Sequence, residues 1–328
     1  MKIVMTLLVR NEEDILDAHL SFHRAAGVDL VLAIDNDSDD STSDILASHA
    51  RDGFVDVRRE TGDLQQAEWV TKLARLAATE FGADWVINGD ADEFYWPRGG
   101  TLKYVFAAVP GRYGGVRGML RNFAPRPESD ESFAEQMIVR ICNPGAEDNS
   151  PYSPRFKAMH RGAPDVSVLA GSNRVLGGGL EPLPGWYPID VLHFPIRSLE
   201  HFTVKYLRWW ALLGTRFSEA VHEAHSRGAL REFYESYVVD DEALAKGVAD
   251  GTLAVDTRLR DALRSLRAEP SRALAFSDAA VDAAYLAELA LLENGEPHAH
   301  VQRKAEDLEA RLAAVEQSHI KAFMRRFA

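Results

Sequence analysis

The stretch ADWVINGDADEFYWP, residues 83–97, sets a cluster of acids directly behind an apolar run. Residues 85–87 are typical of a buried strand, and the acids Asp90, Asp92 and Glu93 follow it closely. In an open α/β sheet, ligands bind beyond the carboxyl ends of the parallel strands. The stretch therefore predicts a strand that opens into a binding crevice lined by acids.

Outward from this stretch, the first 110 residues alternate between apolar strands and helices. Continuous apolar runs indicate strands that are buried on both faces, and segments with helical spacing of apolar residues separate them. This alternation predicts an α/β fold with a mostly parallel sheet flanked by helices. The expected strands are 2–9, 29–35, 54–59 and 84–89, and the expected helices are 12–27, which stops at Gly27, 38–50 and 64–82.

The rest of the chain changes its pattern twice. Between about 112 and 197, strands alternate with polar or Gly-rich stretches, and from 198 onward the sequence is typical of helices. We therefore expect divisions at 1–110, 111–197 and 198–328, the last being a C-terminal helical extension. Apolar residues at alternating four-three spacing within 301–319 predict a helix. This helix could pack on the rest of the protein, or it could form a short coiled coil that holds a dimer together.

Composition limits the partners and the setting. The chain of 328 residues carries a net charge of −13, which argues against nucleic acid as a partner because phosphate backbones need stripes of Lys and Arg. An anionic substrate would instead need a bridging cation. The single cysteine, Cys142, lies in an apolar run and is expected in the core, and its solitude fits a reducing, cytoplasmic setting. No apolar run approaches the length of a transmembrane segment.

Asp90 and Asp92 form the first candidate metal site. Two carboxylates two residues apart at a strand end can share a hard cation, and Mg²⁺ or Mn²⁺ prefers oxygen ligands and tolerates substrate phosphates. A solvated turn is the simpler explanation of such a pair. The buried strand before it and the aromatic run 94–96 after it favour the metal site.

Other polar clusters each have a structural and a functional interpretation. Residues 35–46 lack the Gly and Glu that a calcium loop needs, because Asp40 and Leu46 stand in those places. Asp35 could contact a nucleoside, or the segment could simply cap a helix. His193 could ligate the cation or lie in the core. Arg197 and Lys205 could hold phosphate or pair with surface acids such as Glu200.

Four motifs together resemble the GT-A glycosyltransferases. They are LLVRNEEDIL, IDNDSDDST, ADWVINGDADEFY and LHFPIRSLEHFTVK, spread over roughly residues 1–210. The group that they resemble is family-2-like and family-92-like, with its DADEF and H-[FY]-P-x-R-S motifs. The resemblance implies a metal-dependent transfer of sugar from a nucleotide-sugar donor. It makes 1–110 the donor-binding half and 111–197 the acceptor-side half of one GT-A domain.

The resemblance also implies roles for individual residues. It makes Asp92 the main metal ligand, with Asp90 and His193 beside it, and Mn²⁺ or Mg²⁺ the cofactor. Asn173 stands where relatives often carry a histidine, so no role is carried over to that position. The implied nucleotide-sugar contacts are Val9, Arg10, Asn11, Asp35, Asn36, Asp90, Ala91, Arg197 and Lys205.

Family-2 relatives invert the anomeric carbon, and inversion in one displacement needs a base for the acceptor hydroxyl. The candidates are Asp190, three residues before His193, and Glu181, in the Gly-rich segment 177–188, with Asp165 as a third. The sequence does not choose among them. The segment 177–188 could close over the sugar or be an ordinary surface loop.

Competing functions remain at this stage. A nucleotidyltransferase or an aspartyl phosphatase would use a related sheet, but the chain shows no early Gly-rich phosphate loop and carries RNEE after its first strand. A non-catalytic relative that only binds nucleotide is the other alternative. The resemblance implies a carbohydrate or glycolipid acceptor, and peripheral attachment at the inner membrane face goes with a glycolipid.

Overall fold

Four parallel strands form the first half of the sheet, as the sequence predicts. The computed structural model describes residues 1–62, 65–142, 152, 155–213, 216–270, 274 and 276. Within it the parallel strands run side by side in the order β3-β2-β1-β4. They are β1 (Ile3–Val9), β2 (Leu30–Asp35), β3 (Val55–Arg59) and β4 (Trp85–Asp90).

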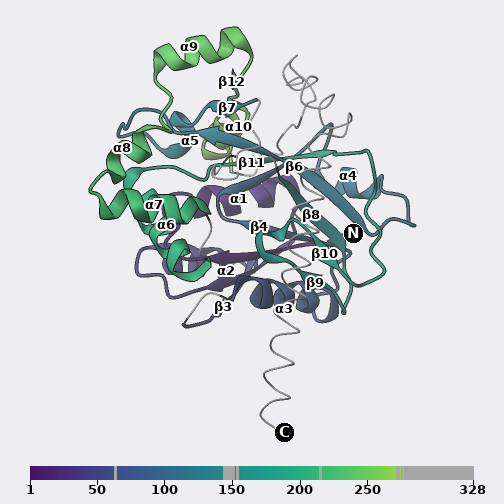
Figure 1. Ribbon diagram of the computed structural model, residues 1–328. Helices are drawn as coiled ribbons and strands as arrows, with labels where there is room; N and C mark the ends of the chain where they lie inside the picture. The colour runs from purple at the N-terminus through teal and green to yellow at the C-terminus, as the bar shows by residue number, and fades with distance from the viewer. Residues whose placement is uncertain are drawn as a thin grey trace, which may run out of the picture. The chain divides into compact units, whose positions relative to one another are not determined.

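Three helices connect these strands and cover both faces of the sheet (Figure 1). Odd-numbered residues of β1 such as Met5 and Leu7 join a core cluster with α1, whereas Val4 packs into a second cluster with α3. Strands that are apolar on both sides require this double cover. The helices are α1 (Leu16–Ala26), α2 (Thr42–Ala50) and α3 (Gln66–Thr79), and Gly27 ends α1 in the left-handed conformation, as expected.

The second half of the sheet is mixed. Strand β8 (Phe156–Arg161) runs antiparallel between β4 and β6 (Gly115–Ala124), and β11 (Ile189–His193) returns parallel to β6. Strand β5 (Glu93–Pro97) pairs antiparallel with β11. The smaller elements are α4 (Leu102–Ala107), α5 (Phe133–Gln136), β7 (Val139–Ile141), β9 (Ser167–Val168), the 3₁₀ turn η1 (Ala170–Ser172) and β10 (Val175–Leu176).

Helices dominate the chain after β11, in line with the predicted extension. Helices α6 (Leu199–Leu213), α7 (Arg216–Ser226) and α8 (Leu230–Glu235) gather around their own apolar cluster, which includes Phe202, Val221 and Tyr234. Helix α9 (Asp241–Asp250) leads to β12 (Leu253–Val255), a strand that the sequence did not predict, paired with β7. Helix α10 (Arg258–Ala268) returns to the main core through Leu259 and Leu263.

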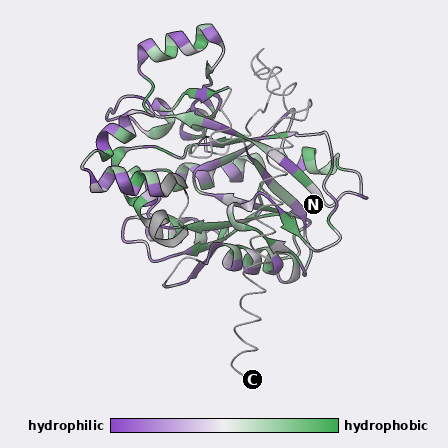
Figure 2. Cartoon of the chain, in the orientation of Figure 1, coloured by the Kyte–Doolittle hydropathy of each residue, from purple (hydrophilic) through white to green (hydrophobic). Residues whose placement is uncertain are grey.

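The predicted α/β architecture, a central sheet flanked by helices, is confirmed. Apolar strands lie in the middle and the helices carry their polar faces outward (Figure 2). Cys142 is buried, as expected of a core residue. The divisions at 110 and 197 stay a prediction, and the predicted tail helix at 301–319 lies outside the described residues.

Candidate functional site

The candidate site lies at the carboxyl end of β4, where the chain turns back on itself. Asp90 ends the strand, Ala91 and Asp92 form the turn, and Glu93 begins β5. Strand register then decides the neighbours, because His193 of β11 lies opposite Glu93 on one side and beside Asn122 of β6 on the other. The turn therefore brings the acids of one motif against the histidine of another.

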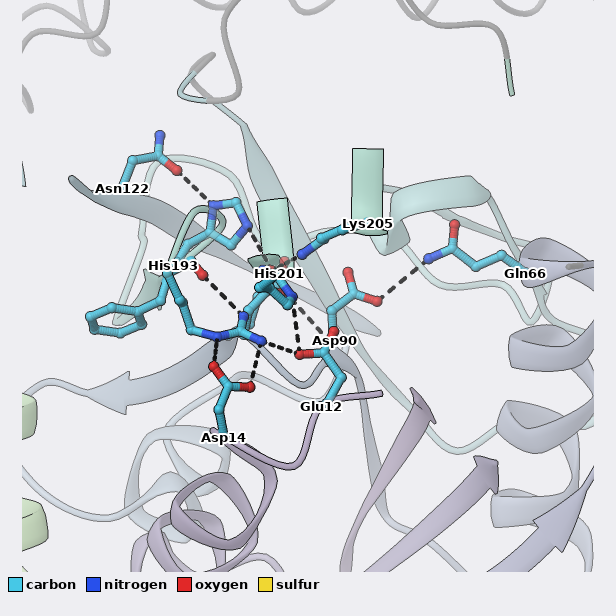
Figure 3. Close-up of polar contacts among 12 residues, drawn as sticks. Glu12, Asp14, Gln66, Asp90, Asn122, His193, His201 and Lys205 are labelled. Atoms are coloured by element: carbon cyan, nitrogen blue, oxygen red, sulfur yellow. Dashed lines mark hydrogen bonds and ion pairs between the residues drawn. The ribbon is translucent and has the colours of Figure 1, made fainter. Parts of the chain in front are cut away.

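Three of these side chains form a group that could hold a metal ion. Among the described residues, ligand atoms of Asp92, Glu93 and His193 lie within 4.8 Å of one another. Two of the three are the expected ligands, and the third is Glu93 rather than Asp90. All three are buried or nearly so, whereas the Asp90 side chain is 29% exposed and accepts a 3.4 Å hydrogen bond from Gln66 (Figure 3).

Asn122 fixes which nitrogen of His193 faces the acids. Its amide N–H donates to the Tyr152 carbonyl at 2.8 Å, so its oxygen is left to accept from His193 Nδ1 at 2.7 Å (Figure 3). Burial lowers the pKa of His193 to about 3, so the ring is neutral. Its Nε2 lone pair then lies 3.7 Å from Asp92 Oδ2. Two acceptor atoms that face each other are suited to a cation between them, so the residues present fit a divalent metal.

Two lysines neutralise the acids in this structure. Lys205 Nζ lies 2.5 Å from Asp92 Oδ2, and Lys157 Nζ lies 2.9 Å from Asp90 Oδ2 and 2.5 Å from Glu93 Oε1. Burying carboxylates without such partners would cost several kcal/mol. Each acid of the DADE motif therefore has an internal counter-ion.

The pKa values of the acids follow from burial and these partners. Burial raises the pKa of Glu93 to about 8, and the Lys157 ammonium only partly opposes this shift. Burial also acts to raise the pKa of Asp92, but the positive charge of Lys205 outweighs it and holds that pKa well below its usual range. Asp92 is therefore the permanent anion of the site.

Arg197 ties the β1–α1 loop to the start of α6. Its guanidinium donates to Asp14 at 2.6 and 2.9 Å and to Glu12 at 2.5 Å, and its side chain is 1% exposed. His201 Nε2 lies 3.6 Å from the same Glu12 carboxylate (Figure 3). Burial would raise the pKa of Glu12, but Arg197 brings it down to about 2. The pairing with Glu200 considered for Arg197 is thus replaced by a buried one with Glu12 and Asp14.

The loops after β1 and β2 brace each other. Asn11, in the left-handed conformation at φ 54°, donates its amide N–H to Asp39 at 2.5 Å and accepts from the Asp39 backbone N–H at 3.0 Å. Asp35 accepts from the backbone N–H of Ser38 at 3.0 Å and from the Ser43 hydroxyl. The Asn36 amide donates to the carbonyls of the β3–α3 loop. These side chains therefore shape the edge of the site.

The remaining predicted contacts lie at the same edge. The Val9 carbonyl accepts from the Asn36 backbone N–H at 2.9 Å, and Ala91 is 3% exposed in the turn. Arg10 is half-buried, and its Nε makes no hydrogen bond within the described part of the chain. The carboxyl ends of β1, β2 and β4 thus converge as the sequence predicts.

Asp190 occupies a different environment from the one expected of a base. It is 3% exposed, and its carboxylate oxygens form ion pairs with three guanidinium groups. The N–O distances are 2.9 Å for Arg98, 3.1 Å for Arg121 and 2.9 Å for Arg258. Burial would raise its pKa, but these three guanidinium groups hold it far below the usual range. A carboxylate so placed is a weak base, and this argues against the predicted catalytic role of Asp190.

Glu181 and Asp165 lie at the other end of the sheet. The Glu181 carbonyl accepts from the backbone N–H groups of Gly114 and Gly115 at 2.9 and 3.2 Å, where β6 begins. Asn122 lies seven residues further along β6, a distance of ~23 Å at ~3.3 Å per residue. Asp165 is exposed and follows β8, whose last residue pairs with the start of β4. Both acids therefore lie away from the metal group in this structure, and their catalytic roles stay predictions. Tyr187 of segment 177–188 stacks on Phe156, the neighbour of Lys157.

Several residues of the site escape sequence reasoning. Lys157 and Asn122 lie on strands without any motif, whereas Asp14 and His201 lie inside two of the quoted motifs but received no role there. A retrospective signal exists for His201, because it lies four residues before Lys205 and shares a face of α6 with it. No comparable pattern marks Lys157.

Comparison with known proteins gives no assignment. No protein-family model matches the sequence, and no curated protein matches it. Among solved structures, S. aureus TarS 1–349 in complex with UDP-GlcNAc has a TM-score of 0.34 at 13% identity and 71% coverage of each chain. The glucosyl-3-phosphoglycerate synthase from Mycobacterium tuberculosis, in complex with Mg²⁺ and UDP, has a TM-score of 0.26 at 17% identity, covering 36% of this chain and 43% of its own. Likenesses at this level carry no functional argument.

Within the described ranges, no helix has both the length and the apolar character needed to cross a membrane.

Proposed function

We propose that this protein is a metal-dependent glycosyltransferase of the GT-A type, related to families 2 and 92, that moves a hexose from a nucleotide-diphosphate donor to an acceptor hydroxyl. One observation carries the proposal. An acidic motif at the carboxyl end of β4 faces the Nε2 atom of a neutral histidine from β11, within 4.8 Å. Ligands of open α/β sheets bind at this edge.

The proposed metal would be held by Asp92 and His193, with Glu93 or Asp90 as the third protein ligand. When bound, Mn²⁺ or Mg²⁺ would neutralise the diphosphate and stabilise it as a leaving group. The chain itself supplies orientation, since Asn122 holds the His193 ring and Lys157 holds Glu93. Arg10, Arg197 and Lys205 contribute positive charge at the same edge. The loops around Asn11 and Asp35 shape the proposed nucleoside pocket.

The proposed reaction is a direct displacement with inversion, which needs a base beside the acceptor. Asp190 and Glu181 stay predictions for this base, and Glu93 and His201, which lie at the site, are further candidates. The proposed acceptor is a carbohydrate or a glycolipid. A cytoplasmic location, with attachment to the inner membrane face for a glycolipid, belongs to the same proposal, as does a dimer formed by the C-terminal helix.

The test is a thermal-shift screen of UDP, GDP, CDP and dTDP, each with and without Mn²⁺. We expect one of them to stabilise the protein only when the metal is present, because ligand bound to the native state alone shifts unfolding by mass action. At a ligand concentration of about 100 Kd the stabilisation is about 2.7 kcal/mol. Asp92→Asn should abolish the metal-dependent part.

The matched control is Asp84→Asn, just before the opposite end of β4, where the carboxylate accepts from the Lys2 backbone N–H. It should respond to metal and nucleotide as the wild type does. If Asp92→Asn keeps the full metal-dependent shift, the assignment of the metal site is wrong. Donor hydrolysis in the presence of Mn²⁺ then separates an active transferase from a relative that only binds nucleotide.

A further inference from the structure

We propose that Lys205 competes with the divalent cation for Asp92 and thereby couples cation binding to binding of the nucleoside diphosphate. This inference rests on the proposed function, and it adds what the proposed function leaves open, namely why metal and nucleotide would depend on each other. It makes Lys205 an exchangeable counter-ion rather than a fixed phosphate ligand.

The competition follows from the position of a single oxygen atom. Asp92 Oδ2 lies 2.5 Å from Lys205 Nζ and 3.7 Å from His193 Nε2. A cation that bridges His193 Nε2 and this oxygen would approach the oxygen to ~2.0–2.2 Å. The ammonium is already bound to this oxygen, and a divalent cation at the same oxygen would be repelled by it. Metal entry therefore favours the departure of Lys205 from Asp92.

Among the described residues, the displaced ammonium has no ready carboxylate partner. The Lys205 side chain is 14% exposed, and after Asp92 the carboxylate that acts on it most is Glu12. The Glu12 carboxylate is already paired with Arg197 at 2.5 Å, and Arg197 itself repels the lysine. A buried ammonium that loses its carboxylate is strongly unfavourable. Metal binding alone is therefore opposed.

A diphosphate removes this opposition because it brings the anion that Lys205 lacks. The lysine stem is flexible and its three N–H donors turn freely, so the ammonium can exchange one anion for another without a large backbone movement. Helix α6 is meanwhile anchored, since the Arg197 pairs hold its start and Phe202 and Tyr206 pack in the cluster with α8. The exchange is thus confined to one side chain.

The consequence is positive cooperativity that must be reciprocal. If nucleoside diphosphate raises the affinity for metal by some factor, metal raises the affinity for nucleoside diphosphate by the same factor. Without the lysine, the metal no longer displaces a cation and the coupling shrinks. This separates the proposal from a role as a fixed phosphate ligand that does not compete for Asp92, in which loss of Lys205 would weaken nucleotide binding and leave metal affinity unchanged.

The first experiment measures Mn²⁺ alone, by the electron paramagnetic resonance signal of the free ion, on wild type and on Lys205→Met. We expect Lys205→Met to bind Mn²⁺ roughly tenfold more tightly, a factor within the usual range of coupling. Equal or weaker affinity would overturn the inference. Lys103→Met is the matched control, because Lys103 pairs with Asp29 at the same 2.5 Å distance on the surface and should leave Mn²⁺ affinity unchanged.

The second experiment titrates Mn²⁺ in the presence of UDP, GDP, CDP or dTDP. Wild type should gain roughly tenfold in metal affinity with one of them and much less with the matching monophosphate, whereas Lys205→Met should gain little. Lys205→Arg keeps the positive charge and should stay weak for metal alone. If Lys205→Met does not fold, the wild type and Lys205→Arg still test the proposal. A wild type in which nucleoside diphosphate does not raise the affinity for Mn²⁺ would contradict it.

A failure of the inference differs from a failure of the proposed function. If Asp92→Asn loses Mn²⁺ while Lys205→Met matches the wild type, the metal site stands and only the exchange is wrong. If Asp92→Asn binds Mn²⁺ as the wild type does, the metal site itself is wrong, and the inference falls with it.

Discussion

A single amide decides what His193 can do. Because Asn122 presents its oxygen to Nδ1, the other nitrogen is left as an acceptor that faces Asp92. A histidine that ligates metal commonly has its second nitrogen held by an acceptor of this kind. The sequence could name His193 as a ligand candidate, but it could not show this partner, which comes from a strand 71 residues earlier.

Asp190 shows how a spacing can mislead. It precedes His193 by three residues, and in a strand such spacing puts two side chains on opposite faces. One faces the metal group and the other faces three arginines. Strand periodicity alone could have separated them once 189–193 was accepted as a strand. The identity of the arginines could not have been predicted, since Arg98, Arg121 and Arg258 come from distant segments.

Asp190→Asn should therefore damage stability and spare ligand binding. Removal of one partner from a buried charge cluster typically costs about 3–5 kcal/mol, because the remaining charges lose their compensation. We expect a loss of this size in urea denaturation, with the affinity of the folded protein for Mn²⁺ and nucleotide unchanged. Asp52→Asn, in the exposed pair with Arg24, is the control and should cost much less.

The opposite pattern would restore the catalytic role. A folded, stable Asp190→Asn variant that binds donor normally and loses turnover would mean that the carboxylate acts as the base after all.

At the scale of elements, the strand β5 carries more of the site than its sequence suggests. EFYWP follows the acids closely enough to be taken for part of a loop, yet it forms a buried strand that sets Glu93 opposite His193. Its register is supported by α1, because His23 Nε2 accepts from the Tyr95 backbone N–H at 3.1 Å. His23 in turn donates from Nδ1 to the His19 carbonyl at 2.8 Å. A helix thus completes the free edge of the strand.

His23→Leu should destabilise the protein by about 1–3 kcal/mol, the usual cost of a buried backbone N–H that loses its partner. His23→Gln offers a carbonyl oxygen in place of Nε2 and should recover much of the loss. Urea denaturation measures the difference, and hydrogen exchange at the Tyr95 amide should accelerate in the Leu variant. Equal stability of the Leu variant and the wild type would show that the bond contributes nothing.

Helices and strands were predictable from the sequence where burial of apolar side chains alone determined the pattern. Strands β1, β2 and β4 and helix α3 follow from continuous apolar runs and helical spacing, because burial on two faces leaves no other pattern. Strands β6, β7 and β11 were visible as apolar segments, whereas β8 was not, and their order in the sheet depends on long connections that no local signal fixes. Strand β12 has three residues and was hidden among helices.

For the whole molecule, an acidic chain places buried cations where its acids converge. The net charge is −13, yet Lys157, Lys205 and Arg197 are each bound to carboxylates at the site. Composition predicted a cation beside an anionic ligand, and that stays a prediction. It could not show that the protein already supplies such cations, because pairing is a property of the folded chain.

A chain that ends at residue 280 should retain the candidate site. Residues 1–280 belong to one compact unit. The site extends from Glu12 to Lys205, and its supporting contacts reach Phe276, which packs in the main core. We expect residues 1–280 to bind Mn²⁺ and nucleoside diphosphate within about twofold of the full chain, measured by the same titrations. A loss of tenfold or more would mean that 281–328 contributes to binding, since each tenfold change in affinity is about 1.4 kcal/mol of contact or preorganisation that the first unit would then lack.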